Sequence, residues 1–152
     1  MSDRGLVFIV DHDTSSADLL QEMLEDDGYA VGRTASGEDA LEGIAGCAPN
    51  LVLLDTHLPD ANPFELLEEL KQSPHARDIP VIFITTLDDA ETRLKGLESG
   101  DDLIVKPFDA REVLARIERQ VTVSKVRMVA GTLWSASSHV SPVARFHTSG
   151  WT

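Results

Sequence analysis

Three continuous apolar runs constrain the fold of this chain most strongly. They are Leu6–Val10, Leu51–Leu54 and Pro80–Ile84. An apolar run without alternation is typical of a strand that is buried on both faces, as in a parallel sheet covered by helices on both sides. The segments that connect such strands are therefore expected to contain helices.

Helical periodicity fills the intervals between these runs. Helices are expected to begin at Asp, Ser or Asn, whose side chains accept hydrogen bonds from the first N–H groups of the helix. The expected starts are Asp13 or Thr14, Ser36 with Asp39 as a capping box, Asn62 before Pro63, Asp88, and Asp109 with Glu112. Weaker strands at Tyr29–Ala35 and Leu103–Val105 complete the alternation. Five strands alternating with five helices predict an α/β domain with a doubly wound parallel sheet and helices on both faces.

The charges divide the chain into two parts. Residues 1–118 contain all 26 Asp and Glu against 9 Lys and Arg, a formal net charge of −17, and residues 119–152 contain 4 basic residues and no acid. An acidic body argues against nucleic-acid binding by this domain, because binding to phosphates requires clustered cations.

Periodicity is lost near residue 122, so the domain is expected to span residues 1–121. The remaining segment, residues 122–152, is expected to be a tail with three open interpretations: a linker to an output domain, an extension of the last helix, or non-native residues. No apolar run approaches the length of a membrane span and no signal peptide is apparent. With a single cysteine, Cys47, no internal disulfide can form, and a cytoplasmic location is expected.

Four of the expected strands end on groups that can carry chemistry, which are Asp11, Asp55, Thr85 and Lys106. Ligands of open parallel sheets bind beyond the carboxyl ends of the strands, so these groups are expected to share one site. Two close carboxylates repel each other and need a cation, and oxygen ligands suit Mg²⁺. A carboxylate in such a site can attack a phosphoryl group, while a hydroxyl and an ammonium neutralise its oxygens.

Four segments in this order resemble the signatures of response-regulator receiver domains. They are Val10–Asp13, Leu53–Asp60, Ile84–Thr86 and Lys106–Phe108, and the resemblance covers residues 5 to about 121. It implies a flavodoxin-like fold with strand order 2-1-3-4-5, and a two-component signalling switch rather than an enzyme. A sensor histidine kinase or a phosphotransfer protein is the implied partner.

The resemblance also implies a role for each site residue. Asp55 would be the phosphoacceptor, and Thr85 and Lys106 would bind the phosphoryl group. Asp11, Asp55 and the main-chain carbonyl of His57 would hold Mg²⁺. The peptide bond between Lys106 and its proline is expected to be cis. Phosphorylation is expected to reshape the face formed by the last two helices and the final strand, through which a homodimer or another partner would bind.

The chain departs from the family pattern at several positions. His12 replaces the second acid of the usual pair, and neutral imidazole is a poor ligand for Mg²⁺, so weakened metal binding is expected. Asp13 could compensate, although it is also placed to cap a helix. Leu103 stands where an aromatic ring is common, Thr86 where a smaller residue is common, and Ala61–Pro63 replaces a Met-Asp-Gly segment.

Two alternatives remain for the function. The chain could be a receiver-like module that acts by protein contact without phosphorylation, an idea supported mainly by His12. Alternatively, Asp11–Asp13 resembles the start of haloacid-dehalogenase-type phosphohydrolases, with Asp11 as nucleophile. In those enzymes the second acidic cluster follows the lysine, whereas Asp101 and Asp102 precede Lys106. The order of the motifs therefore disfavours the phosphohydrolase.

Overall fold

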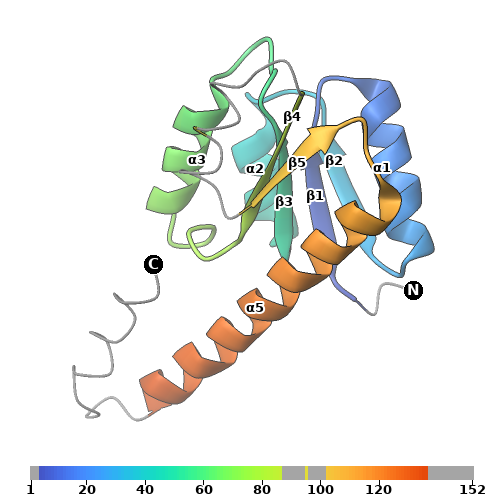
Figure 1. The fold of residues 1–152 in the computed structure, drawn as a ribbon. Coiled ribbons are helices and arrows are strands. Elements are labelled where there is room, and N and C mark those ends of the chain that lie inside the picture. The colour runs from blue at the N-terminus through green and yellow to red at the C-terminus, as the bar shows by residue number, and fades with distance from the viewer. Residues whose placement is uncertain (1–3, 87–94, 96–101, 137–152) are drawn as a thin grey trace.

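The fold is a five-stranded parallel sheet with helices on both faces (Figure 1), seen in a computed structural model that describes residues 4–86, 95 and 102–136. The strands are β1 (Leu6–Val10), β2 (Ala30–Thr34), β3 (Leu51–Asp55), β4 (Val81–Thr86) and β5 (Asp102–Lys106). The helices are α1 (Thr14–Asp26), α2 (Ala40–Cys47), α3 (Pro63–Gln72) and α5 (Ala110–Ala136). The strand order β2-β1-β3-β4-β5 confirms the predicted topology.

The register of the sheet brings the ends of β1 and β3 together. Val10 is paired with Leu54, so the residue after each of them lies at the same edge of the sheet. On the other side of β3, Asp55 is paired with Ile84 of β4. Because all five strands are parallel, their carboxyl ends form one continuous edge, where the expected site residues are found.

Two hydrophobic clusters fill the space between the sheet and its helices. The cluster under α1 and α5 contains, among others, Ile9, Leu20, Leu53, Ile84 and Ile117. The cluster under α2 and α3 contains, among others, Phe8, Ile44, Leu54, Leu66 and Phe83. Alternate residues of each central strand belong to opposite clusters, which explains why these strands are apolar without interruption.

Several helices begin at the predicted capping residues. Asp13 precedes α1 and its carboxylate accepts hydrogen bonds from the N–H groups of Ser15 and Ser16. Asn62 accepts from the N–H groups of Phe64 and Glu65 at the start of α3. Asp109 accepts from the N–H of Arg111 at the start of α5. The Glu112 carboxylate instead accepts a hydrogen bond from the side chain of Arg116.

The predicted capping box at Ser36 and Asp39 is only partly correct. The Ser36 hydroxyl accepts a long hydrogen bond of 3.4 Å from the Asp39 N–H, but Asp39 makes no side-chain cap bond and α2 begins at Ala40. A carboxylate from another loop completes the turn: Asp60 accepts hydrogen bonds from the Ser36 hydroxyl and from the N–H groups of Gly37 and Glu38. The loop after β3 is thereby tied to the loop after β2.

The last helix is longer than the sequence pattern predicts. Its expected end lay near residue 121, whereas α5 continues to Ala136 and extends past the edge of the sheet (Figure 1). Of the three interpretations of the tail, an extended last helix describes the backbone of residues 122–136. Residues 137–152 and most of the helix expected over residues 88–99 lie outside the described residues. Among the described helices, none has the length and apolarity needed to cross a bilayer.

Candidate functional site

Three charged side chains converge at the carboxyl edge of the sheet. Lys106 Nζ lies 3.6 Å from Asp11 Oδ2 and 3.7 Å from Asp55 Oδ2. The two carboxyl side chains are almost fully buried, and the Lys106 side chain is 19% exposed. The second oxygen of each carboxyl accepts a main-chain hydrogen bond, from the N–H of Asp13 to Asp11 and from the N–H of His57 to Asp55.

The two buried acids of this pocket disfavour each other's charged form. Burial, together with the neighbouring Asp55, raises the pKa of Asp11 to about 7. The ammonium of Lys106 and the hydrogen bond from Asp13 lower this pKa but do not restore its ordinary value. An added cation would therefore stabilise the charged form of the pocket.

Thr85 completes the edge of the sheet between the acids and the lysine. It is fully buried and follows Ile84, the β4 residue that is paired with Asp55. Within the described part of the chain, its hydroxyl makes no hydrogen bond. A buried hydroxyl without a partner costs free energy, and a ligand oxygen entering the pocket could satisfy it.

The residues after Asp11 do not supply the second acid that the family pattern has. His12 is exposed. Both oxygens of Asp13 are occupied by the start of α1, since Oδ1 accepts from two N–H groups and Oδ2 accepts from the Ser16 hydroxyl at 3.0 Å. These bonds lower the pKa of Asp13. The expected compensation by Asp13 is therefore not seen, because the side chain is used as a helix cap.

The donor set fits Mg²⁺ in part. Asp11 Oδ2 is buried and accepts no hydrogen bond from the described residues, so it has an oxygen to offer to a cation. Within residues 4–86, 95 and 102–136, however, no group of three His, Cys, Asp or Glu side chains could hold a metal. Two carboxylates are present where the family pattern has three, and Lys106 already lies near both.

Two further expectations can be compared with the structure. The Lys106–Pro107 peptide bond is cis, as predicted. Leu103, at the position where a ring is common, is buried in the cluster beneath α2 and α3.

Sequence reasoning missed the interactions of the two residues that follow Asp55. The Thr56 hydroxyl donates to the carbonyl oxygen of Ile84 at 3.1 Å, which fastens the end of β3 to β4. His57 Nδ1 lies 3.3 Å from that hydroxyl oxygen and 3.9 Å from Asp55 Oδ1. The His57 side chain is 49% exposed. The contact of Thr56 with Ile84 depends on the pairing of β3 with β4, which no local pattern reveals.

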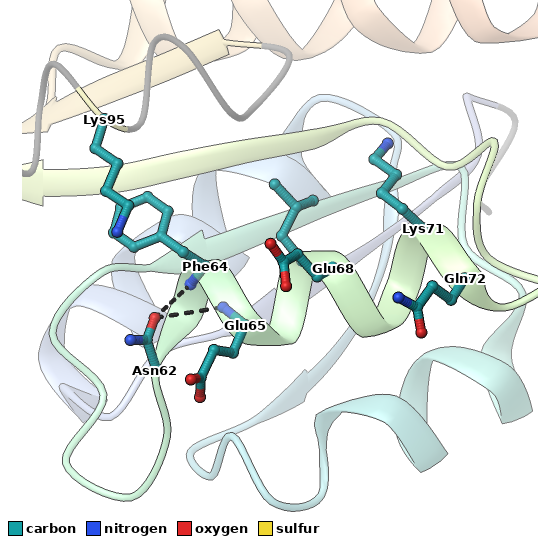
Figure 2. Close-up of a pocket in the computed structure, with 8 residues that line it drawn as sticks. Asn62, Phe64, Glu65, Glu68, Lys71, Gln72 and Lys95 are labelled. Carbon is teal, nitrogen blue, oxygen red and sulfur yellow. Dashed lines mark hydrogen bonds between the residues drawn. The ribbon is translucent and has the colours of Figure 1, made fainter.

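Two of the hollows lined by the described residues lie outside the acidic pocket. The larger, of about 790 Å³, runs along α3 and contains none of the predicted site residues. Figure 2 shows Lys95 at one end of this hollow. Its Nζ lies 4.7 Å from the centre of the Phe64 ring. The smaller, of about 410 Å³, adjoins the site. It is lined by Ser15, Ser16, Leu19, Lys106, Pro107 and Phe108. Leu19 is the one large apolar side chain classed as exposed among the described residues.

Comparisons with known proteins agree with this geometry. Residues 7–118 match the response regulator receiver domain family. The chain is 36% identical over 118 residues to the DNA-binding dual master transcriptional regulator RpaA of Synechocystis, covering 73% of this chain and 46% of RpaA. It is 38% identical over 115 residues to the transcriptional regulatory protein CreB of Escherichia coli, covering 75% and 49%.

A solved structure shows the same fold. The signal receiver domain of a signal transduction histidine kinase from Syntrophus aciditrophicus superposes with a TM-score of 0.71 at 30% identity, covering 78% of this chain and 90% of that domain. The chain spans about half the length of the curated relatives named above. These relatives are transcriptional regulators, and the matches favour a receiver over the phosphohydrolase alternative.

Proposed function

Because this chain belongs to the response regulator receiver domain family of two-component systems, we propose that it accepts a phosphoryl group on Asp55. The observation that carries the proposal is the contact of one ammonium, Lys106, with both buried carboxylates. A site of this kind can hold a phosphoryl group between anionic and cationic groups at the end of the sheet.

The proposed reaction uses Asp55 as the nucleophile. A carboxylate oxygen of Asp55 forms a bond to phosphorus while the bond between phosphorus and the donor atom breaks, and the donor leaves with that electron pair. Lys106 would neutralise one phosphoryl oxygen and the Thr85 hydroxyl would donate to another. The donor would be a phosphohistidine of a sensor kinase or of a phosphotransfer protein.

We propose that Asp11, Asp55 and the main-chain carbonyl of His57 would hold Mg²⁺. A bound Mg²⁺ supplies positive charge for the phosphoryl oxygens and relieves the repulsion between the two acids. Because His12 and Asp13 contribute no carboxylate, the site is proposed to bind Mg²⁺ less tightly than a site with three acids.

The smaller hollow suggests how a partner reaches Asp55. Its lining is mainly apolar, and it lies between the start of α1 and the segment after Lys106. The exposed Leu19 on α1 would contact an apolar side chain of the phosphodonor protein, because burying Leu19 removes apolar surface from water.

Phosphorylation would then shift the chain between two conformations. The phosphoryl group would interact with Thr85, which lies one residue before the end of β4, and with Lys106, the last residue of β5. The resulting change would reach the face made by β5 and α5. That face is the proposed site for a partner or a second copy of the chain.

A module that works by contact alone is the second candidate, and the exposed His12 favours it. Incubation with acetyl phosphate and Mg²⁺, followed by intact mass measurement, separates the two. An added phosphoryl mass that is lost in Asp55→Asn and kept in Asp26→Asn, an exposed control on α1, supports the switch. No added mass with Mg²⁺ or Mn²⁺ would support the contact module.

A further inference from the structure

We infer that Asp60 is a positioning residue, which holds the loop after β3, and with it the main-chain carbonyl of His57, in the place where the pocket binds Mg²⁺. The inference rests on the proposed function, which makes that carbonyl a ligand of the cation. It assigns a role to a carboxylate outside the pocket. Asp60 lies on the same loop as His57, in the segment between β3 and α3.

The Asp60 carboxylate joins two loops that are distant in the sequence. Its Oδ2 accepts hydrogen bonds from the Ser36 hydroxyl at 2.8 Å and from the N–H of Glu38 at 3.1 Å. Its Oδ1 accepts from the N–H of Gly37 at 3.1 Å. These bonds lower the pKa of Asp60, so the carboxylate is charged at neutral pH and each bond is charge-assisted. Because both oxygens are occupied in this way, Asp60 acts through the loop and not as a ligand of the cation.

Close packing holds the same two loops together without any charge. A methyl group on Gly37 would overlap the side chain of Ala61 and would lie 3.4 Å from that of Leu58. Leu58 is buried in the hydrophobic cluster beneath α2 and α3. The bare backbone of Gly37 therefore allows the loops to meet, and a larger residue there would push the loop after β3 away from the loop after β2.

The peptide that carries the His57 carbonyl lies between two fixed points. On one side, the N–H of His57 donates to Asp55 Oδ1 at 3.0 Å. On the other side, Leu58 is buried and Asp60 is bound to the loop after β2. If the bonds to Asp60 are lost, this part of the backbone gains conformational freedom, and the carbonyl samples more positions.

A fixed carbonyl matters more in this pocket than in one with three acids. Mg²⁺ requires near-ideal octahedral geometry, so a ligand that samples many positions binds it less tightly. The pocket offers two carboxylates, Asp11 and Asp55, and the His57 carbonyl is the third proposed protein ligand. Removal of a group that orients a metal ligand typically weakens metal binding by about 10- to 100-fold. We expect a value at the lower end of this range, because a loosely held loop still offers its carbonyl.

The test is a titration of the full chain with MgCl₂, followed by amide NMR signals. In Asp60→Asn one acceptor oxygen becomes an N–H donor, and the Kd for Mg²⁺ should rise on the order of tenfold. Ser36→Ala removes one of the three bonds and should raise the Kd by a smaller factor. Asp39→Asn is the control for charge, because the Asp39 carboxylate lies in the loop after β2 but makes no side-chain cap bond, and should keep the wild-type Kd.

The same titration reports whether the two loops are coupled. In the wild type, the N–H signals of Gly37 and Glu38, which donate to Asp60, should shift with the same Kd as the N–H signal of His57. In Asp60→Asn, the His57 signal should still shift at higher Mg²⁺, while the other two should no longer follow it. A role of Asp60 in stability alone would not change this pattern.

A charge-neutral pair of variants tests the packing. Gly37→Ala should raise the Kd in the same direction as Asp60→Asn, although it removes no charge. In the double variant Gly37→Ala/Ala61→Gly, the side chain that the new methyl group would overlap is absent. Most of the wild-type affinity for Mg²⁺ should therefore return.

Each outcome decides a different point. A wild-type Kd in Asp60→Asn would overturn the inference and leave the proposed metal site intact. An equal rise of the Kd in Asp39→Asn would show that net charge, and not position, sets the affinity, and would also overturn it. So would a double variant that binds Mg²⁺ as weakly as Gly37→Ala. If Mg²⁺ shifts no signal of the pocket in the wild type, the metal site of the proposed function itself fails, and this inference fails with it.

Discussion

Lys106 Nζ lies 3.6 Å from Asp11 Oδ2, an oxygen that accepts no hydrogen bond from the described residues. The ammonium is near enough to lower the pKa of Asp11, yet burial of the carboxyl group and repulsion from Asp55 raise that pKa to about 7. The pocket of the metal-free chain is therefore least stable when both acids are charged. Stability should depend on pH accordingly.

We predict that the free energy of unfolding of the metal-free wild type falls as pH rises from about 4 to about 7. The unfolded chain releases the Asp11 proton near its ordinary pKa of 3.8, whereas the folded chain holds it to about 7. Each unit of difference between the pKa of the folded and of the unfolded chain corresponds to about 1.4 kcal/mol, so the free energy of unfolding falls by at most about 4 kcal/mol. Urea unfolding followed by circular dichroism across this range measures it.

The control for this dependence is a pair of isosteric variants. Asp11→Asn has no carboxyl group at this position to titrate. Its free energy of unfolding should therefore change much less between these pH values than that of the wild type. Asp26→Asn, an exposed change near the end of α1, should retain the fall. Equal pH profiles for Asp11→Asn and the wild type would contradict the assignment.

A second prediction concerns the coupling between Asp55 and the rest of the fold. Lys106→Ala should accept a phosphoryl group on the order of 10- to 100-fold more slowly, because one charge-assisted hydrogen bond is lost. Once phosphorylated, it should show little change in the amide NMR signals of α5. Lys71→Ala removes an exposed lysine from α3 and should respond fully. A full response of α5 in Lys106→Ala would rule out this coupling.

A third prediction separates two glycines of the same helix. A methyl group on Gly43 would lie 2.6 Å from the ring of Phe8, which is 3% exposed, so this buried ring would have to shift. Gly43→Ala should therefore destabilise the fold by about 1–3 kcal/mol. Gly46 has nothing within 4 Å of the same methyl position, so Gly46→Ala should be neutral or stabilise by up to about 1 kcal/mol. Urea unfolding of the two variants compares them directly.

The sequence predicts the fold well because burial leaves a local pattern. A strand covered on both faces is apolar throughout, so the run Leu51–Leu54 identifies a buried strand. Asp55, the next residue, is therefore predicted to lie at the carboxyl end of the sheet. The contact of Thr56 with Ile84 and the tie from Asp60 to the loop after β2 depend on which strands are neighbours, and no local pattern reports them. The extension of α5 was one of three interpretations that the sequence left open, because the apolar period that marks a helix packed on a core is not apparent after about residue 121.

The fourth prediction asks what limits metal binding in this pocket. His12→Asp adds a carboxylate at the position where the family pattern has its second acid, while Asp13 remains occupied as the cap of α1. Because the affinity of an oxygen site for a hard cation rises with the number of charged ligands, the Kd for Mg²⁺ should fall by on the order of tenfold. Isothermal titration calorimetry measures the change, and His75→Asp controls for the added charge alone. An unchanged Kd in His12→Asp would mean that the competition of Lys106 for Asp11 and Asp55, and not the missing acid, sets the affinity. If His12→Asp binds Mg²⁺ more weakly than the wild type, both explanations are excluded. Under either of them, an added carboxylate would strengthen the binding of the cation or leave it unchanged.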